Sequence, residues 1–269
     1  MATYGIIGDI HGNLEGLQAV LAELQRRRVS DLLCIGDVIG YNADSNECVA
    51  LVRQRGIRTI AGNHDLIGIR RLGFERCSNK ARYSLTRTRE QLSQDSIAWL
   101  ASLPDNLLVD DQLALIHGGV RDVQLYMRTP SLVRLNVPLL RMDFPTARIC
   151  FFGHCHEQKV YEVCGEEVAD VTGARVRLSR ERTYFINPGS VDAQRKPGSR
   201  LAEFAVFDSD LWEVEFVTVP YHDELTESKA IGQGFRIGAL MDRWYTLRRR
   251  AANKLARVGA RFRGQRPQG

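Results

Sequence analysis

The chain has 269 residues, 44% of them hydrophobic, which is enough for one large globular domain or for a domain with a small addition. No apolar run reaches the ~18–20 residues that a membrane-spanning helix needs, and the first residues lack a signal-peptide pattern. The six cysteines show neither a CxxC pair nor the spacing of a disulfide framework. We therefore expect a cytoplasmic protein with free thiols.

The net charge of +5 is unevenly distributed along the chain. Residues 242–269 hold nine basic side chains and one acidic side chain, whereas residues 1–241 hold 28 basic and 31 acidic ones. The basic character therefore belongs to the end of the chain and not to the part that carries the motifs described below.

The first sixty residues alternate between strand and helix patterns. Apolar strands are predicted at 4–7, 32–35 and 58–61. One helix is expected after Asn13, a suitable N-cap, and another over 46–55. This βαβαβ order predicts a largely parallel sheet and an α/β fold.

The middle of the chain follows a mixed pattern. Residues 66–103 are helical in periodicity, with Ser93 as the candidate cap of the last helix. Two strands are predicted within 107–117, a short helix at 131–142, and a strand at 148–152.

Short alternating runs between residues 159 and 219 indicate antiparallel strands. There is no internal repeat and no low-complexity linker. We therefore expect one domain over residues 1–222, followed by a helical, basic C-terminal extension over 223–269.

Polar residues gather directly after apolar runs in five separate segments. These are Gly8-Asp9-Ile10-His11-Gly12-Asn13, Gly36-Asp37, Gly62-Asn63-His64-Asp65, His117-Gly118-Gly119 and Gly153-His154-Cys155-His156. In an open α/β sheet such positions are the carboxyl ends of strands, where ligands bind. Side-chain alternation along an extended strand predicts that Asp9 and His11 share one face, and likewise His154 and His156.

The segments together offer two carboxylates, one amide oxygen and four imidazoles, which are too many ligands for one tetrahedral metal site. Mixed nitrogen and oxygen ligation suits Mn, Fe, Zn or Ni, and we expect two divalent ions, Mn first. Two adjacent metals that share a carboxylate acidify a bridging water and clamp the oxygens of an in-line displacement at phosphorus. Five of the six histidines fall inside these segments, which favours metal binding over unrelated surface roles.

The ordered pattern DxH…GD…GNHD…H…GHxH resembles the signature of calcineurin-like metallophosphoesterases over residues 4–207. The segment Asn187-Pro188-Gly189-Ser190-Val191 resembles the YfcE-like phosphodiesterase branch of that family. The resemblance implies a four-layer α-β-β-α sandwich of two mixed sheets flanked by helices. It also implies hydrolysis of a phosphodiester or monoester in a small organic phosphate or nucleotide, by in-line attack of a metal-bridging hydroxide.

The resemblance also divides the metal ligands between two ions: Asp9, His11 and His156 for the first, Asn63, His117 and His154 for the second, and Asp37 between them. His64 matches a histidine that acts as an acid or charge stabiliser near the leaving oxygen, and Asp65 would orient it.

Several residues allow two interpretations. Asn13 and Tyr41 either contact substrate or only shape the turns around the site. Arg121 either reaches a substrate phosphate or forms a surface salt bridge. Residues 187–190 form either a plain turn or a loop beside the site.

Three other functions compete with the leading hypothesis: a nucleic-acid-directed phosphodiesterase, a dinucleoside polyphosphate hydrolase, and a non-catalytic metal-binding scaffold. Symmetrical dinucleoside tetraphosphate hydrolases carry an arginine shortly after the second-motif aspartate, and here Asp37-Val38-Ile39-Gly40-Tyr41 lacks it. We therefore expect the chain to lie outside that branch, with activity on a dinucleotide left open. The resemblance allows a homodimer, and the sequence leaves the oligomeric state open.

The end of the chain, from Met241 to Phe262, has apolar residues at helical spacing with arginines between them. Such a helix binds an anionic membrane, nucleic acid or a partner, or docks its apolar stripe on its own domain. The sequence favours docking on the domain.

Overall fold

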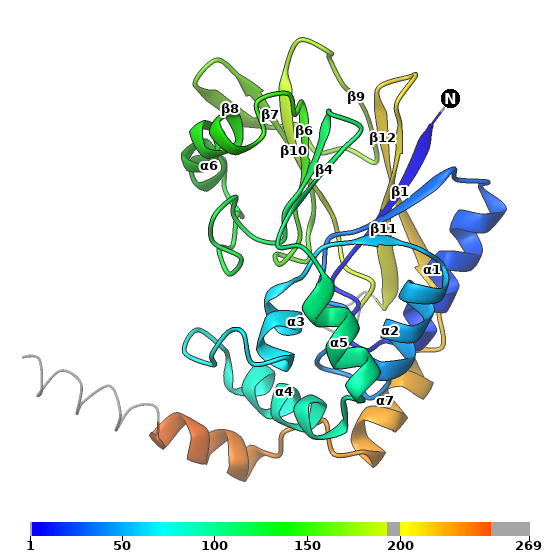
Figure 1. The fold of residues 1–269 in the computed structure, drawn as a ribbon, viewed down its shortest axis with the longest axis vertical. Coiled ribbons are helices and arrows are strands. Elements are labelled where there is room, and N and C mark those ends of the chain that lie inside the picture. The colour runs from blue at the N-terminus through cyan, green and yellow to red at the C-terminus, as the bar shows by residue number, and fades with distance from the viewer. Residues whose placement is uncertain (1, 193–199, 249–269) are drawn as a thin grey trace, which may run out of the picture.

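Two mixed sheets and the helices on their outer faces form four layers (Figure 1). The computed structural model describes residues 2–192 and 200–248. The first sheet, sheet A, consists in spatial order of β3 (Arg58–Thr59), β2 (Asp31–Cys34), β1 (Thr3–Ile7), β11 (Leu201–Asp208), β12 (Glu213–Pro220) and β9 (Arg175–Arg177). Sheet B consists of β4 (Leu107–Val109), β5 (Leu113–Leu115), β6 (Ile149–Phe151), β10 (Thr183–Pro188), β7 (Gln158–Cys164) and β8 (Glu167–Asp170). The expected four-layer α/β sandwich is confirmed.

The predicted βαβαβ unit forms the N-terminal half of sheet A. Strand β1 pairs in parallel with β2, and β2 pairs in parallel with β3. The crossovers are α1 (Leu14–Arg26) and α2 (Ser45–Gln54). Asn13 caps α1, because its side chain accepts the backbone N–H of Gly16 at 2.9 Å. The carboxyl ends of β1 and β2 therefore lie side by side.

The prediction of a helical pattern over 66–103 is wrong for residues 69–78. The structure has three helices here, α3 (Asn63–Gly68), α4 (Asn79–Gln91) and α5 (Gln94–Ser102). Arg70 has a left-handed φ of 66°, which ends the first helical run, and Ser78 caps α4 by accepting the N–H of Ala81. The predicted cap Ser93 is confirmed at the start of α5.

The remaining elements follow the expected pattern. Strands β4 and β5 form an antiparallel pair, and α6 (Pro130–Asp143) leads into β6. Antiparallel pairing joins β10 to β7, β7 to β8, and β11 to β12. The strands in the second half of the chain are therefore shared between both sheets.

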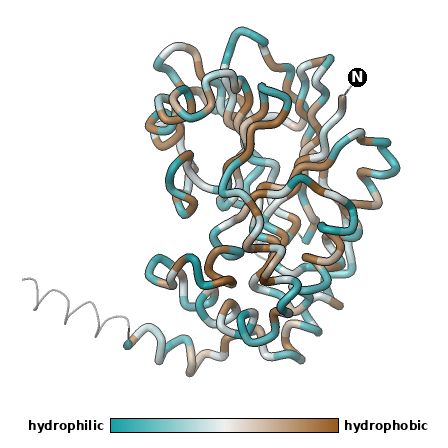
Figure 2. The backbone as a smooth tube through the Cα atoms, viewed as in Figure 1, coloured by the Kyte–Doolittle hydropathy of each residue, from teal (hydrophilic) through white to brown (hydrophobic). Residues whose placement is uncertain are grey.

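Side-chain alternation along the strands produces three hydrophobic interfaces between the four layers. Ile7 packs with helices α1 and α2 on the outer face of sheet A, while its neighbour Ile6 points between the sheets. Leu113 and Leu115 point between the sheets, while Ala114 packs toward α6. Figure 2 shows hydrophobic residues concentrated in the strands and hydrophilic residues in the outer loops.

Helix α7 (Asp223–Gly232) packs against α1. Lys229 Nζ lies 2.5 Å from Glu15 and 2.9 Å from Asp44, and the Thr226 hydroxyl donates to Glu15 at 2.8 Å. These ion pairs attach the segment after β12 to α1 and to the start of α2, the helices of the βαβαβ unit. The expected domain boundary at residue 222 stays a prediction.

A last described helix covers residues 239–248 and contacts α4 through its polar side. Asn79 Nδ2 donates to Asp242 Oδ1 and to Thr246 Oγ1, each at 2.9 Å. Met241, Trp244 and Leu247 of the predicted stripe are 44%, 46% and 55% exposed, whereas Tyr245 is half-buried, so the expected docking of the apolar stripe is wrong for all but Tyr245 in this part. The rest of the predicted amphipathic helix lies outside the described residues.

No helix in the described ranges is long and apolar enough to cross a membrane. All six cysteines are free, as expected, and four of them are buried: Cys34, Cys48, Cys150 and Cys155.

Candidate metal centre

The metal-ligand candidates begin where the central strands end. Residues 9–12 pair with residues 36–38 through backbone hydrogen bonds, including Asp9 N to Gly36 O at 3.0 Å and His11 N to Asp37 O at 2.9 Å. The two loops therefore fix each other. This places the first two motifs at one edge of sheet A.

Five of the candidate ligands have left-handed backbone conformations, with φ between 50° and 66°: Asp9, His11, Asp37, His154 and His156. The expected cause of their arrangement, alternation along an extended strand, is therefore wrong. Asp9 and His11 do meet, but through consecutive sharp turns beyond the end of β1. His154 and His156 belong to different ligand groups.

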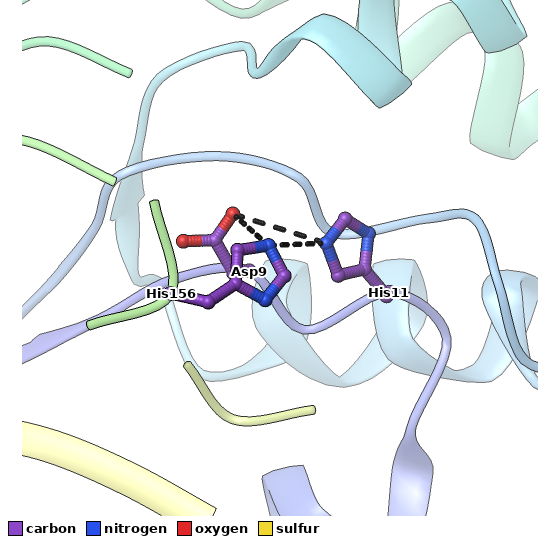
Figure 3. A group of neighbouring side chains, drawn as sticks. All are labelled: Asp9, His11 and His156. Atoms are coloured by element: carbon purple, nitrogen blue, oxygen red, sulfur yellow. Dashed lines mark hydrogen bonds and ion pairs between the residues drawn. The ribbon is translucent and has the colours of Figure 1, made fainter. Parts of the chain in front are cut away.

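The first group consists of Asp9, His11 and His156 (Figure 3). His156 Nε2 lies 3.1 Å from Asp9 Oδ1 and 3.1 Å from His11 Nε2. All three side chains are buried. Figure 3 shows the two imidazole nitrogens and the carboxylate oxygen converging on one point.

The second group consists of Asp37, His117 and His154, with Asn63 beside it. His117 Nε2 lies 3.3 Å from Asp37 Oδ2 and 3.0 Å from Asn63 Oδ1. Asp37 Oδ2 also lies 3.7 Å from His11 Nε2 of the first group. Asp37 thus stands between the two groups.

The chemistry of this donor set fits cations. His117 Nδ1 lies 2.8 Å from Ile35 O and His11 Nδ1 lies 3.3 Å from Ile39 O. Because a carbonyl oxygen only accepts, these contacts place a proton on Nδ1, so Nε2 is the ring nitrogen that can give up its proton to bind a metal. Both Nε2 atoms then face carboxylate oxygens, an arrangement that a positive ion stabilises.

His154 gives a second indication that the site binds cations. Its Nε2 atom is buried and has no hydrogen-bond partner among the described residues. Its backbone N–H donates to Asp9 Oδ2 at 3.0 Å, which connects the two groups. Burial, and next the charge of His117, lower the pKa of His154 to about 3, so the imidazole stays neutral and able to ligate.

Asp37 stays ionised in this setting. Burial alone would raise its pKa, but the charges of His117 and His64 hold that pKa well below its usual value. Burial would lower the pKa of His117, but the charge of Asp37 raises it to about 9. The site is thus built around a buried carboxylate anion.

His64 lies beside both groups and against an aromatic ring. Its ring centroid lies 4.5 Å from that of His11 and 4.7 Å from that of Tyr41. Its backbone N–H donates to Asp37 Oδ1 at 2.7 Å. Gly40, at φ 132°, faces it so closely that an added Cβ would lie 2.3 Å from His64 Nδ1. Glycine is therefore required there for the imidazole to fit.

The Asp65 carboxylate accepts hydrogen bonds from the backbone. Oδ2 accepts the N–H of Asp37 at 2.8 Å and that of Gly62 at 2.9 Å, while Oδ1 accepts those of Val38 and Ile39 at 3.0 and 3.2 Å. These bonds hold the turn that carries Asp37. The expected contact by which Asp65 orients the His64 ring stays a prediction.

The end of β10 and the residues that follow it lie beside the site, as the loop interpretation expected. The Ser190 hydroxyl donates to Asp9 O at 2.9 Å, and Val191 N donates to Gly8 O at 3.1 Å. Asn187 Nδ2 donates to Gly153 O at 3.1 Å, just before His154. Residues 187–191 therefore hold the two loops that carry Asp9 and His154.

A cavity of about 300 Å³ opens onto the second group. Asp37, Asn63, His64 and His154 line its base, and Tyr41 lines its wall. The structure thus brings Tyr41 to the site, which the sequence left undecided.

The lining residues that escaped the sequence analysis include Arg76, Gln124 and Tyr126. The Tyr126 ring lies 3.9 Å from that of His154. Arg76 comes from the segment mistaken for helix, and its guanidinium is held by Asp122 at 2.7 Å. None of these three lining residues belongs to a motif, so no local signal in the sequence marked them.

The other two candidate substrate contacts are engaged elsewhere. Asn13 is fully buried, and besides capping α1 it donates to Asp192 at 3.3 Å. Arg121 forms a two-point ion pair with Asp143, at 2.6 and 2.9 Å. Arg121 therefore makes the salt bridge that the sequence allowed as its alternative.

This fold and this cluster of buried ligands define a metal-binding phosphoesterase. The model of the calcineurin-like phosphoesterase superfamily domain matches residues 3–210, and the chain belongs to that family, which the motifs resemble. It is accordingly a hydrolase that acts on phosphate esters. The finer resemblance to the YfcE-like branch stays a prediction.

Among solved structures, a metallophosphoesterase from Sphaerobacter thermophilus is similar, with a TM-score of 0.70 and 29% identity over 90% of this chain and 97% of that one. An uncharacterized protein of Methanocaldococcus jannaschii is 28% identical over 219 residues, which are 80% of this chain and 86% of that protein.

A symmetrical bis(5'-nucleosyl)-tetraphosphatase of Pectobacterium carotovorum is 33% identical over 156 residues, which are 56% of this chain. The match spans 48% of the length of that relative. The expectation that this chain lies outside that branch, because it lacks the arginine after Asp37, stays a prediction.

Proposed function

We propose that the chain is a dinuclear-metal phosphodiesterase. The observation that supports this most is the position of Asp37, whose Oδ2 lies 3.3 Å from His117 and 3.7 Å from His11. One carboxylate oxygen thus lies within reach of both ligand groups. A shared carboxylate of this kind is the usual link between two metals about 3.5–4 Å apart.

In this proposal, Asp9, His11 and His156 hold one ion, Asn63, His117 and His154 hold the other, and Asp37 belongs to both. A divalent pair held there would acidify a water and neutralise charge on the phosphoryl oxygens. The donor set of nitrogen and oxygen atoms suits Mn, Fe, Zn or Ni, and we propose Mn.

The protein itself would supply proton transfer and substrate positioning. His64 faces the cavity beside Asp37, where an imidazole can protonate the leaving oxygen or stabilise its charge. Tyr41 packs against His64 at 4.7 Å and limits the positions that the imidazole can take. Arg76 brings a fixed cation to the cavity wall, a suitable contact for a phosphate oxygen.

The direct test is hydrolysis of bis-p-nitrophenyl phosphate by purified protein reconstituted with Mn. We expect turnover that rises with metal content up to two ions per chain. A protein that binds two ions but shows no turnover would instead support a non-catalytic scaffold.

A second candidate activity is hydrolysis of a dinucleoside polyphosphate. A neighbouring cavity of about 630 Å³ shares Tyr41 and Ser78 with the metal-site cavity. Lys80, Arg200 and Arg236 line it; Arg200 pairs with Asp223 and Arg236 with Glu227, so Lys80 is the cation most available for an additional phosphate. The tetraphosphatases named among the relatives act on a substrate of this kind.

Comparison of two substrates separates the candidates. For a dinucleoside polyphosphatase, kcat/KM for diadenosine tetraphosphate exceeds that for bis-p-nitrophenyl phosphate, and Lys80→Ala lowers only the former. Equal kcat/KM values, unaffected by Lys80→Ala, would rule out a role for this second cavity.

A further inference from the structure

A second basic cavity lies apart from the metal centre. It has a volume of about 510 Å³ and lies between the segment 70–75 and α4. We call it the arginine pocket, because four of its lining residues are arginines: Arg70, Arg71, Arg82 and Arg89. It shares no lining residue with the cavity at the metal centre.

Two of these arginines, Arg82 and Arg89, donate hydrogen bonds to backbone carbonyl oxygens, which carry no negative charge. Arg89 Nε donates to Ile67 O at 2.8 Å, and its Nη2 donates to the same oxygen at 2.5 Å. Arg82 Nη2 donates to Phe74 O at 3.2 Å. Carbonyl oxygens orient a guanidinium without neutralising it. The two cations are therefore held in place with their positive charge intact.

The remaining charges do little to change this balance. Arg71 pairs with Asp105 at 3.2 Å, but both side chains are about half exposed, so the pair is weak. Arg70 is exposed, and no ion pair of its side chain is found in the described ranges. Glu75 is the single acidic residue that lines the pocket. Among the described residues, Arg71 is thus the one arginine of the four that has an ion pair, and Glu75 is the one carboxylate in the lining.

An aromatic ring keeps the guanidinium groups together. The Cζ atoms of Arg82 and Arg89 lie 5.7 and 4.2 Å from the centre of the Phe74 ring. Burial, and next the charge of Arg70, lower the pKa of Arg89, so the positive charges crowd one another. Tyr245, from the last described helix, completes the wall.

We propose that the arginine pocket binds a small polyphosphate anion, such as the phosphate chain of a nucleoside triphosphate. Fixed guanidinium groups match the paired oxygens of phosphate, and the site accumulates positive charge that an anion would neutralise. Its volume suits a ligand the size of a nucleotide.

The site also has a connection to the metal centre. Residues 70–75 line the arginine pocket, while Arg76, Cys77 and Ser78, which follow directly, line the cavity over Asp37. A ligand of the arginine pocket would therefore contact the same segment that forms the wall of the metal-site cavity.

The test is isothermal titration of inorganic tripolyphosphate, as its magnesium complex, into the full chain. The buffer holds an excess of the ion that fills the metal centre, which prevents stripping. We expect a binding event, separate from any at the metal centre, that Arg70→Gln and Arg82→Gln each weaken by about 10-fold or more, the usual effect of losing a charged hydrogen bond. Turnover of bis-p-nitrophenyl phosphate in Arg70→Gln should stay at the wild-type level.

Arg134→Gln is the matched control. Arg134 is an exposed cation on α6, which packs on sheet B and is not part of the arginine pocket. Equal weakening by Arg134→Gln, or no effect of either pocket variant, would overturn the proposal. Tighter binding of a short oligothymidylate than of tripolyphosphate would also overturn it, in favour of a nucleic-acid surface. Binding is measured without turnover, so an inactive enzyme would leave this test intact.

Discussion

The backbone N–H of His64 donates to Asp37 Oδ1 at 2.7 Å, while Asp37 Oδ2 faces His117 at 3.3 Å. The two oxygens of one carboxylate thus have different partners. One fixes the start of the helix that carries the proposed catalytic histidine, and the other faces both ligand groups. The Asp37 side chain therefore takes part both in the proposed metal site and in positioning His64.

This connection predicts the behaviour of Asp37→Asn. The amide keeps an oxygen that can accept the His64 N–H, but it removes the negative charge between the ligand groups. We expect metal content to fall from two ions per chain to one or fewer, and turnover to fall about 100-fold or more. Elemental analysis and the diester assay measure both, and two ions with near-wild-type turnover would refute the bridging role.

His64→Ala is expected to separate chemistry from metal binding. Turnover should fall by about 100-fold or more, the usual contribution of a general acid, while metal content stays at the wild-type value. The control is His222→Ala, since His222 is exposed and lies outside every motif. A loss of metal in His64→Ala would show that this imidazole acts as a ligand.

Gly40→Ala is predicted to disturb the site through the backbone turn. The new methyl group would lie 2.3 Å from His64 Nδ1 and 3.2 Å from His11 Nδ1, so the imidazoles must shift. We expect kcat to fall by about 10-fold or more, since small misplacements of catalytic groups are costly. Gly56→Ala is the matched control: it also has a positive φ, 62°, but nothing lies within 4 Å of an added Cβ.

Asp65→Asn tests the support beneath Asp37. An amide has one acceptor oxygen in place of two, so part of the set of four backbone N–H donors loses its partner. We expect the free energy of unfolding to fall by about 1–3 kcal/mol, measured by urea denaturation. Asp95→Asn, at an exposed position on α5, should change it by less than about 1 kcal/mol. Equal losses in both variants would contradict the supporting role.

The stability that the docking of α7 contributes should depend on pH. Burial would raise the pKa of Glu15, but the hydrogen bonds from Lys229 and Thr226 bring it below the usual value of 4.5. A lowered folded-state pKa stabilises the fold above the unfolded-state value, and this stabilisation is lost as the pH falls through the folded-state pKa. The stability gap between the wild type and Glu15→Gln should therefore be largest near neutral pH and shrink below about 4.5. A gap independent of pH would disprove the ionic contribution.

Much of the fold could be predicted because periodicity is a local property. The strands at 4–7 and 148–152 stand out as short apolar runs, and the caps Asn13 and Ser93 follow from their own side chains. Residues 69–78 resemble a helix in sequence because many of them are charged. In the structure, the left-handed backbone at Arg70 ends the preceding helix, and Ser78 caps the start of the next one.

The candidate site shows the same division. Its ligands stand in short ordered motifs, which a sequence displays directly. Tyr126 and Arg76 reach the cavity only through folding, since one precedes α6 and the other precedes α4. Arg121 was ambiguous because its partner Asp143 lies at the far end of α6.

The left-handed backbone at Asp9, His11, Asp37, His154 and His156 has a consequence for how this family of sequences can change. Each such conformation in a residue with a side chain is unfavourable by about 1–2 kcal/mol, and glycine relieves it. A lineage that gave up catalysis would gain stability by replacing these ligands with glycine. Under the proposed function, the five strained side chains serve the chemistry at the edges of these two sheets at a cost in stability.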